Sequence, residues 1–175
     1  MKLVRESLNE ISVGKKSGLG ALGIGKSNMI RKWLDEKHVT NYKINDDSTI
    51  DVRGDVILES EVDGALPDFI QFRIVTGDFN IQANNLLHLK GCPYTVGKDF
   101  VCSLNELGSL DFCPKTVGKD FLIFDNKYKD FSEKEIRNRC SIGGRVYIDE
   151  NEWLDASYVI NPDDAPSAHT KYFKR

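Results

Sequence analysis

The chain has 175 residues, of which 40% are hydrophobic and 29% are charged, and its formal net charge is −3. This length suits one domain with its own hydrophobic core, and the nearly balanced charge gives no strong field to attract nucleic acid or an anionic membrane. No apolar run reaches the about 20 residues of a membrane-spanning helix, and the N-terminus lacks the apolar stretch of a secretory signal. The composition therefore predicts a cytoplasmic protein without a membrane partner, and it disfavours a nucleic-acid partner.

The first part of the chain, residues 1–40, is expected to be a helical region with a glycine-rich linker. Residues 2–12 and residues 28–38 each place apolar side chains at helical spacing. The linker, residues 14–25, separates these two segments and carries all five glycines of this region.

One motif in this region suggests chemistry. The segment Gly20–Ser27 (GALGIGKS) matches the phosphate-binding pattern G-x-x-x-x-G-K-[ST]. A P-loop also needs a buried strand immediately upstream, and residues 12–18 (SVGKKSG) contain no such run. We therefore expect a linker that leads into a helix, with Lys26 in solvent, and keep a nucleotide-binding enzyme only as an alternative.

The next segment predicts a β-hairpin. In residues 42–52 the apolar pairs Tyr42/Ile44 and Ile50/Val52 flank a polar turn. Alternation of this kind on both sides of a turn is typical of two antiparallel strands. We expect this hairpin to cap whatever follows it.

An internal repeat dominates the rest of the chain. Residues 92–100 read CPYTVGKDF and residues 113–121, which start 21 residues later, read CPKTVGKDF. Each copy leads into an apolar-x-apolar-x-x-Asn-x-apolar pattern. The four best copies of this pattern are Phe79-x-Ile81-x-x-Asn84-x-Leu86, Phe100-x-Cys102-x-x-Asn105-x-Leu107, Phe121-x-Ile123-x-x-Asn126-x-Tyr128 and Val146-x-Ile148-x-x-Asn151-x-Trp153.

These repeats predict the fold, an α/β chain that forms a short leucine-rich-repeat-like parallel β-solenoid of about five turns over residues 41–154. Side chains alternate along a strand, so the apolar pairs should stack into columns inside the solenoid. The asparagines should form a ladder that satisfies backbone groups at each bend. Trp153 and Leu154 are expected to close the core, and residues 155–175 are expected to be an irregular tail.

The repeat also resembles a known group of proteins. The pattern carried by Leu89, Gly91–Pro93, Val96, Gly97, Asp99, Phe100, Cys102, Asn105, Leu107, Ser109 and Leu110 is similar to that of uncharacterised leucine-rich-repeat-like proteins of tailed bacteriophages and related bacterial elements. The opening MKLVRESLNE resembles the N-terminal region of the same proteins. The resemblance implies the solenoid fold and a phage or phage-host setting in a bacterial cell. It assigns no functional residues.

Cysteine and histidine give no catalytic or metal site. The four cysteines lack the C-x-x-C spacing of zinc sites, and Cys92 and Cys113 share one repeat position, so we interpret them as small buried hydrophobes. The three histidines have no neighbouring nucleophile pattern. We therefore expect no catalytic residue, no metal and no cofactor.

The register instead predicts a surface for a partner. The residue before each strand is an aspartate in four turns, and alternation places these aspartates on the face opposite the core. This column is either an acidic stripe for a basic partner or a set of acceptors for local turn N–H groups. The next columns on this face contain apolar residues, which indicates a partner or a cover from the same chain. The candidate partner-binding residues are Asp78, Asp99, Val101, Leu104, Asp120, Leu122, Phe124 and Tyr147.

The sequence therefore predicts a non-enzymatic protein-binding module, encoded by a phage and directed at a host or phage protein in host takeover or defence evasion. Self-association through the same surface is an open possibility. A structural component of the virion or of its assembly remains an alternative, as does the nucleotide-binding enzyme described above.

Overall fold

The computed structural model describes residues 19–159, so the expected helix at 2–12 and residues 160–175 of the expected tail lie outside the described residues. Helix α1 (Leu19–Glu36) begins nine residues earlier than expected and takes up part of the glycine-rich linker. Its anchoring side chains, Ile30 and Leu34, are fully buried in the first turn of the fold. Once this part of the helix is fixed, each further residue is added without the cost of nucleation, so the helix extends in the N-terminal direction.

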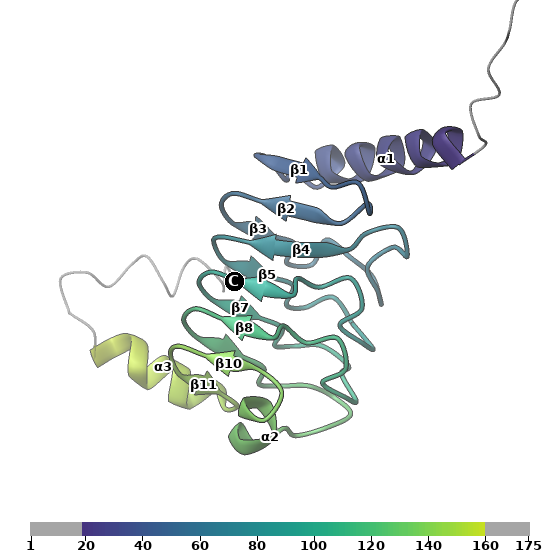
Figure 1. The fold of residues 1–175 in the computed structure, drawn as a ribbon. Coiled ribbons are helices and arrows are strands. Elements are labelled where there is room, and N and C mark those ends of the chain that lie inside the picture. Colours follow the sequence, from purple (N-terminus) through teal and green to yellow (C-terminus); the bar gives the residue numbers. More distant parts are fainter. Residues whose placement is uncertain (1–18, 160–175) are drawn as a thin grey trace, which may run out of the picture.

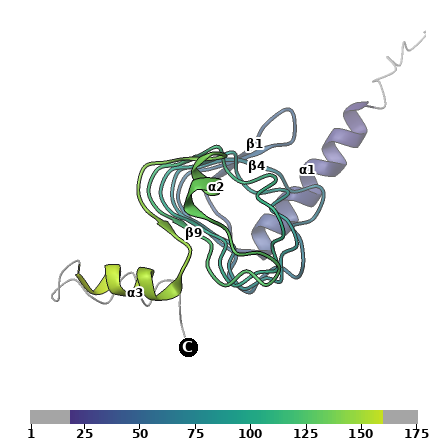
Figure 2. The same ribbon diagram turned by 90° about the horizontal axis from the view of Figure 1, so that it is seen from below.

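After α1 the chain winds into a β-solenoid whose turns superpose when viewed along the axis (Figures 1 and 2). Two sheets form its sides, with strand orders β1-β2-β4-β6-β8-β10 (sheet A) and β11-β9-β7-β5-β3 (sheet B). The strands of sheet A are β1 (Tyr42–Ile44), β2 (Ile50–Val52), β4 (Phe72–Val75), β6 (Thr95–Val96), β8 (Thr116–Val117) and β10 (Ser141–Ile142). The strands of sheet B are β3 (Val56–Ile57), β5 (Phe79–Asn80), β7 (Phe100–Val101), β9 (Phe121–Leu122) and β11 (Val146–Tyr147).

The topology confirms the solenoid and its hairpin cap. All neighbouring strands are parallel except β1 and β2, which pair antiparallel as the hairpin pattern of residues 42–52 predicts. The five strands of sheet B are linked by about four full turns. Each turn therefore contributes one short strand to each sheet and returns by an irregular third side.

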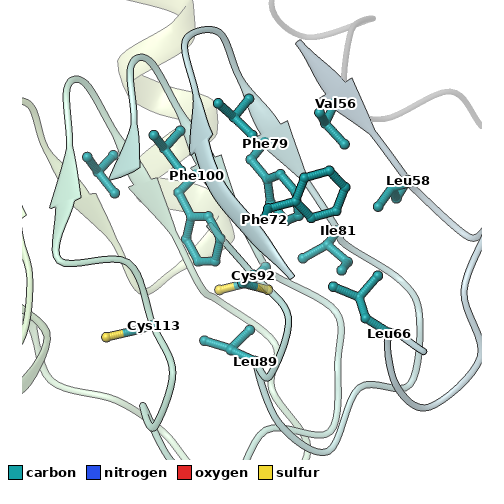
Figure 3. Close-up of a cluster of buried hydrophobic side chains, with 14 of the residues drawn as sticks. Val56, Leu58, Leu66, Phe72, Phe79, Ile81, Leu89, Cys92, Phe100 and Cys113 are labelled. Carbon is teal, nitrogen blue, oxygen red and sulfur yellow. The ribbon is translucent and has the colours of Figure 1, made fainter. Parts of the chain in front are cut away.

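A column of phenylalanines fills the interior (Figure 3). The rings of Phe79 and Phe100 stack with their centroids 6.0 Å apart, and Phe121 continues the column 5.0 Å beyond Phe100. Phe72 of sheet A meets Phe79 edge-on at 5.3 Å. All four rings are fully buried. The predicted register of the repeats is therefore confirmed.

The asparagine ladder is also confirmed. The side-chain amide of Asn84 donates to the carbonyls of Leu58 and Gln82, and its Oδ1 accepts from the backbone N–H of Val62 in the preceding turn at 2.7 Å. Asn105 and Asn126 repeat this arrangement one and two turns further along. The ladder joins each bend to the next through buried hydrogen bonds.

Glycine is required at the corner between the two sheets. A Cβ atom on Gly118 would overlap the carbonyl oxygen of Gly97, and one on Gly97 would overlap the carbonyl oxygen of Thr76. The backbones of successive turns approach too closely here for a side chain, which explains why the repeat keeps glycine at this position.

The last turn departs from the predicted pattern. Helix α2 (Glu133–Arg137) occupies the longer spacing before β10 and buries Ile136 in the end of the core. Tyr128 and Ile148, expected in the core, are 59% and 40% exposed. Asn151 lies in helix α3 (Glu150–Val159) and not in the ladder. Trp153 is buried outside the main core, so the prediction that it closes the core is wrong.

The cysteines are part of the packing. All four are free and buried, which confirms their interpretation as small hydrophobes. Burial raises the pKa of the Cys140 thiol to about 12, so this thiol is protonated at neutral pH. None of the described helices is long and apolar enough to cross a membrane.

Candidate functional site

The candidate site is the outer face of sheet B, which is the side of its strands turned away from the phenylalanine column. The strand register aligns the side chains of successive turns into three columns on this face. The first column contains Asp55, Asp78, Asp99, Asp120 and Arg145. The second contains Ile57, Asn80, Val101, Leu122 and Tyr147, and the third contains Glu59, Gln82, Ser103, Phe124 and Asp149.

The aspartates of the first column form a second ladder. Oδ1 of Asp78 accepts the backbone N–H of Asp99 at 3.1 Å, and Oδ1 of Asp99 accepts that of Asp120 at 3.0 Å. Asp55 and Asp120 do the same at the two ends, with Asp78 and Arg145 as donors. One interpretation of the sequence was that each aspartate accepts backbone N–H groups of its own turn. The structure shows acceptance from the following turn, so the carboxylates tie neighbouring turns together.

The same ladder concentrates negative charge. Asp78 is buried and Asp99 is half-buried. Burial is the main reason that the pKa of Asp99 is raised, and the charges of Asp78 and Asp120 raise it further. Lys98 lies 3.5 Å from Asp55 at one end of the column. Because like charges about 5 Å apart repel, the column favours any cation brought to it from outside the sheet.

The apolar part of the face forms a second hydrophobic cluster, separate from the core. Val101, Leu122, Phe124 and Tyr147 are each at most 6% exposed, and they pack with Trp153 of α3. The rings of Phe124 and Trp153 are 6.5 Å apart. The apolar column predicts either a partner or a cover from the same chain. Within the described residues the structure shows a cover from the same chain, helix α3.

Polar side chains continue the face toward the N-terminal end of the solenoid. Asn80, Gln82 and Ser103 are fully buried. Oδ1 of Asn80 accepts the backbone N–H of Gln82 at 3.0 Å. Nδ2 of Asn80 and Oγ of Ser103 are buried and have no hydrogen-bond partner within residues 19–159. Buried polar atoms normally have a partner, so these two atoms are exceptions among the described residues.

Two apolar residues mark the accessible margin of the site. Ile57 at the first strand is 41% exposed, and Leu104 at the bend beside Ser103 is 39% exposed with a φ of 56°. The structure therefore brings seven of the eight candidate residues onto one face and places Leu104 at its margin. The other apolar residues among the eight candidates are buried, whereas the side chain of Leu104 is exposed.

Sequence reasoning assigned Trp153 to the wrong place. The repeat pattern aligned it with core leucines, although a helix start was also readable in the sequence. Asp149 precedes Glu150 and Glu152, and acidic residues of this kind are typical of the first turn of a helix. Oδ1 of Asp149 accepts the backbone N–H of Asn151 at 2.7 Å, as an N-terminal cap does.

The other candidate chemistry is not assembled by the described residues. Gly20–Ser27 is part of α1, and beyond the first turn of a helix the backbone N–H groups bond to carbonyls of the preceding turn and do not cradle a phosphate. Within residues 19–159, no three His, Cys, Asp or Glu side chains are grouped so that they could hold a metal ion. Comparison with protein-family models, with curated proteins and with solved structures finds no match.

Proposed function

We propose that this chain is a non-enzymatic protein-binding module, encoded by a phage and acting on a host or phage protein in the bacterial cytoplasm. The observation that carries the proposal is the second hydrophobic cluster, in which an element outside the repeat docks on the outer face of sheet B through Trp153. A face that already receives one apolar segment has the shape and chemistry to receive another. The resemblance of the repeat to phage proteins supports the setting.

The physical character of the face supports a protein partner. A ladder of buried hydrogen bonds and a second ladder of part-buried ones hold its strands in place, so binding costs little ordering of the site itself. Its apolar centre is covered by α3, and the accessible margin carries the apolar residues Ile57 and Leu104, with the acidic column on the same face. This margin suits a segment with aromatic and basic residues. Repeat solenoids generally bind proteins through extended rigid surfaces of this kind.

The accessible margin offers a direct test. A photo-crosslinking amino acid is placed at Leu104 or, as a matched control, at Thr116, which is exposed on sheet A. The chain is then expressed in the bacterial host with and without phage infection. We expect the probe at Leu104 to capture one defined protein that the probe at Thr116 does not capture.

Purified components then decide the outcome. The captured protein should bind the isolated chain, and Leu104→Asp should weaken binding at least tenfold without lowering the unfolding temperature. Equal capture profiles at Leu104 and Thr116 would contradict the proposal. The pair Leu122→Lys and Tyr147→Lys is less suitable, because both residues are buried under α3 and the change would also disturb the fold.

A further inference from the structure

The two sheets end differently at the N-terminal end of the solenoid. In sheet A, the hairpin places β1 outside β2 in antiparallel pairing, so the terminal turn of this sheet is covered by a further strand. In sheet B, β3 is the terminal strand and pairs with β5. Among residues 19–159, no strand pairs with the other side of β3. We call this side the open edge of sheet B.

The backbone of Ile57 is directed at the open edge. The N–H of Val56 donates to the carbonyl of Asp78 in the next turn at 2.8 Å, and the N–H of Leu58 also donates to that turn. Successive N–H and C=O groups of a strand point to opposite sides, so those of Ile57 point away from β5. Within residues 19–159 neither group of Ile57 has a hydrogen-bond partner. The side chain of Ile57 is 41% exposed, so the edge is accessible.

The neighbours of Ile57 give the open edge a charge pattern. Asp55 is exposed and Glu59 is half-buried, and alternation along the strand places both on the same face as Ile57. Lys98 lies 3.5 Å from Asp55 and offsets part of its charge. The order of side chains along the edge is therefore acidic, apolar, acidic.

We propose that the open edge of sheet B binds an extended segment of a partner protein by antiparallel β-strand addition. In this arrangement one residue of the segment exchanges both backbone hydrogen bonds with Ile57. The side chains of the segment on the outer face are basic, apolar and basic at alternate positions, opposite Glu59, Ile57 and Asp55. This inference rests on the proposed function, because it gives the binding mode of the same module.

The charge pattern disfavours a second copy of this chain as the occupant. Antiparallel pairing of two β3 strands about Ile57 would place Asp55 of each copy opposite Glu59 of the other, and like charges directly opposite each other destabilise a strand pair. Stacking of a whole solenoid on β3 is hindered by α1, which lies at this end of the stack (Figure 1). A helix is about 10 Å wide, whereas neighbouring strands are about 4.8 Å apart. A single extended segment needs only the width of one strand.

The test titrates the full chain, labelled with nitrogen-15, with the synthetic peptide TKTVTKT, which is acetylated and amidated at its ends. The peptide carries the basic, apolar, basic pattern on one face. At millimolar peptide we expect the backbone amide signals of β3 and β5 to shift, with the largest change at Ile57. The amides of β8 and β10 should not shift. The absence of any shift, or shifts confined to sheet A, would overturn the proposal.

Two matched peptides separate the backbone from the side chains. N-methylation of the valine keeps every side chain and removes the N–H that faces Ile57, so the dissociation constant should rise by about tenfold or more. Equal binding of the methylated peptide would overturn β-strand addition. The peptide TETVTET keeps the backbone and reverses the charge, and it should bind more weakly than TKTVTKT. Equal binding of these two peptides would overturn the proposed charge pattern.

A variant of the chain tests the same hydrogen bond from the other side. Ile57→Pro removes the outward N–H, and proline is accepted on an edge strand where this group has no ladder partner. Binding of TKTVTKT should weaken by about tenfold or more. Ile57→Thr is the matched control, since it keeps the N–H and a β-branched side chain, and binding should change by less than about threefold. The thermal unfolding of both variants is measured, and if Ile57→Pro is unfolded, the methylated peptide with the unmodified chain decides.

The outcomes distinguish this inference from the proposed function. Capture of a partner at Leu104 together with no binding of TKTVTKT would overturn β-strand addition alone. Binding of TKTVTKT at Ile57 together with equal capture profiles at Leu104 and Thr116 would contradict the proposed function alone.

Discussion

At the scale of single residues, the ladders show how one side chain serves two turns. The side-chain oxygen of Asn105 accepts the backbone N–H groups of Asn84 and Leu86 at 3.0 Å. Its amide nitrogen donates to three carbonyls around the bend. Asn105 is buried, so water cannot replace these bonds if the side chain is lost. Each unsatisfied backbone group then carries a desolvation cost.

Asn105→Ala is therefore expected to lower the free energy of unfolding by about 3 kcal/mol, because several buried backbone groups lose their partner at once. Urea unfolding followed by circular dichroism measures this loss. Asn151→Ala is the matched control, since Asn151 has the same repeat position but is exposed in α3. It should change the free energy by less than about 0.5 kcal/mol. Equal effects of the two substitutions would show that the ladder is not a source of stability.

The comparison of Asn105 with Asn151 also shows what the sequence could predict. The phenylalanine column and the asparagine ladder were predictable because the same residue recurs at the same spacing. Only stacking of the turns in register buries every phenylalanine and gives every asparagine its hydrogen-bond partners. Trp153 and Asn151 match the repeat pattern by residue type alone. In this turn the acidic residues of α3 start a helix, and the local helix preference wins over the repeat.

At the scale of secondary-structure elements, the two ends of the solenoid are closed by different devices. Helix α1 and the β1–β2 hairpin cover the N-terminal end, and α2 covers the C-terminal end (Figure 1). In the interior, the turn carbonyls accept N–H groups from the next turn, as the carbonyl of Val117 accepts from Gly143 at 2.9 Å. Within residues 19–159, no further turn follows the last one to supply these donors.

Arg137 of α2 supplies donors in place of the missing turn. Its guanidinium group donates to the carbonyls of Ile142 and Gly144 at 3.4 and 3.1 Å and is held by Glu133 at 2.7 Å. The other described turns have no helix at the position of α2, so no repeat pattern could reveal it. Its sequence signals were Ser132, which caps the helix by accepting the N–H of Glu135, and the acidic residues Glu133 and Glu135 in the first turn.

Arg137→Met should loosen the last turn while leaving the centre of the solenoid intact. The methionine keeps much of the aliphatic stem but cannot donate to the terminal carbonyls. Native-state hydrogen exchange is expected to speed up by about tenfold at the amides of β10 and β11, which corresponds to about 1.4 kcal/mol of local stability. The amides of β5 and β7 should be unaffected. Lys134→Met, an exposed change on the same helix, is the control. Uniform acceleration along the whole chain would contradict a local cap.

At the scale of the whole molecule, the fold has two hydrophobic clusters with different roles. The main cluster runs the length of the solenoid and depends on neighbouring turns only, so its stability is shared along the stack. The second cluster lies on the outer face of sheet B and depends on α3. The sequence predicted the apolar residues of this face and left open what covers them. Whether a partner or the same chain covers these residues depends on where α3 packs. That packing is a tertiary contact, and the repeat carries no signal for it.

Trp153→Ala tests the separation of the two clusters. Loss of the indole ring removes the contact with Phe124 and should release α3, which exposes Val101, Leu122 and Tyr147 to solvent. We expect increased fluorescence of a bound hydrophobic dye and self-association in sedimentation, because large exposed apolar patches promote contact between chains. The circular dichroism of the sheets should persist, since the phenylalanine column is untouched. Met29→Ala, which shortens an exposed apolar side chain on α1, should produce neither effect. Cooperative unfolding of the entire chain in Trp153→Ala would instead mean that the outer face and the core form one unit, and that no partner could displace α3 without unfolding the solenoid.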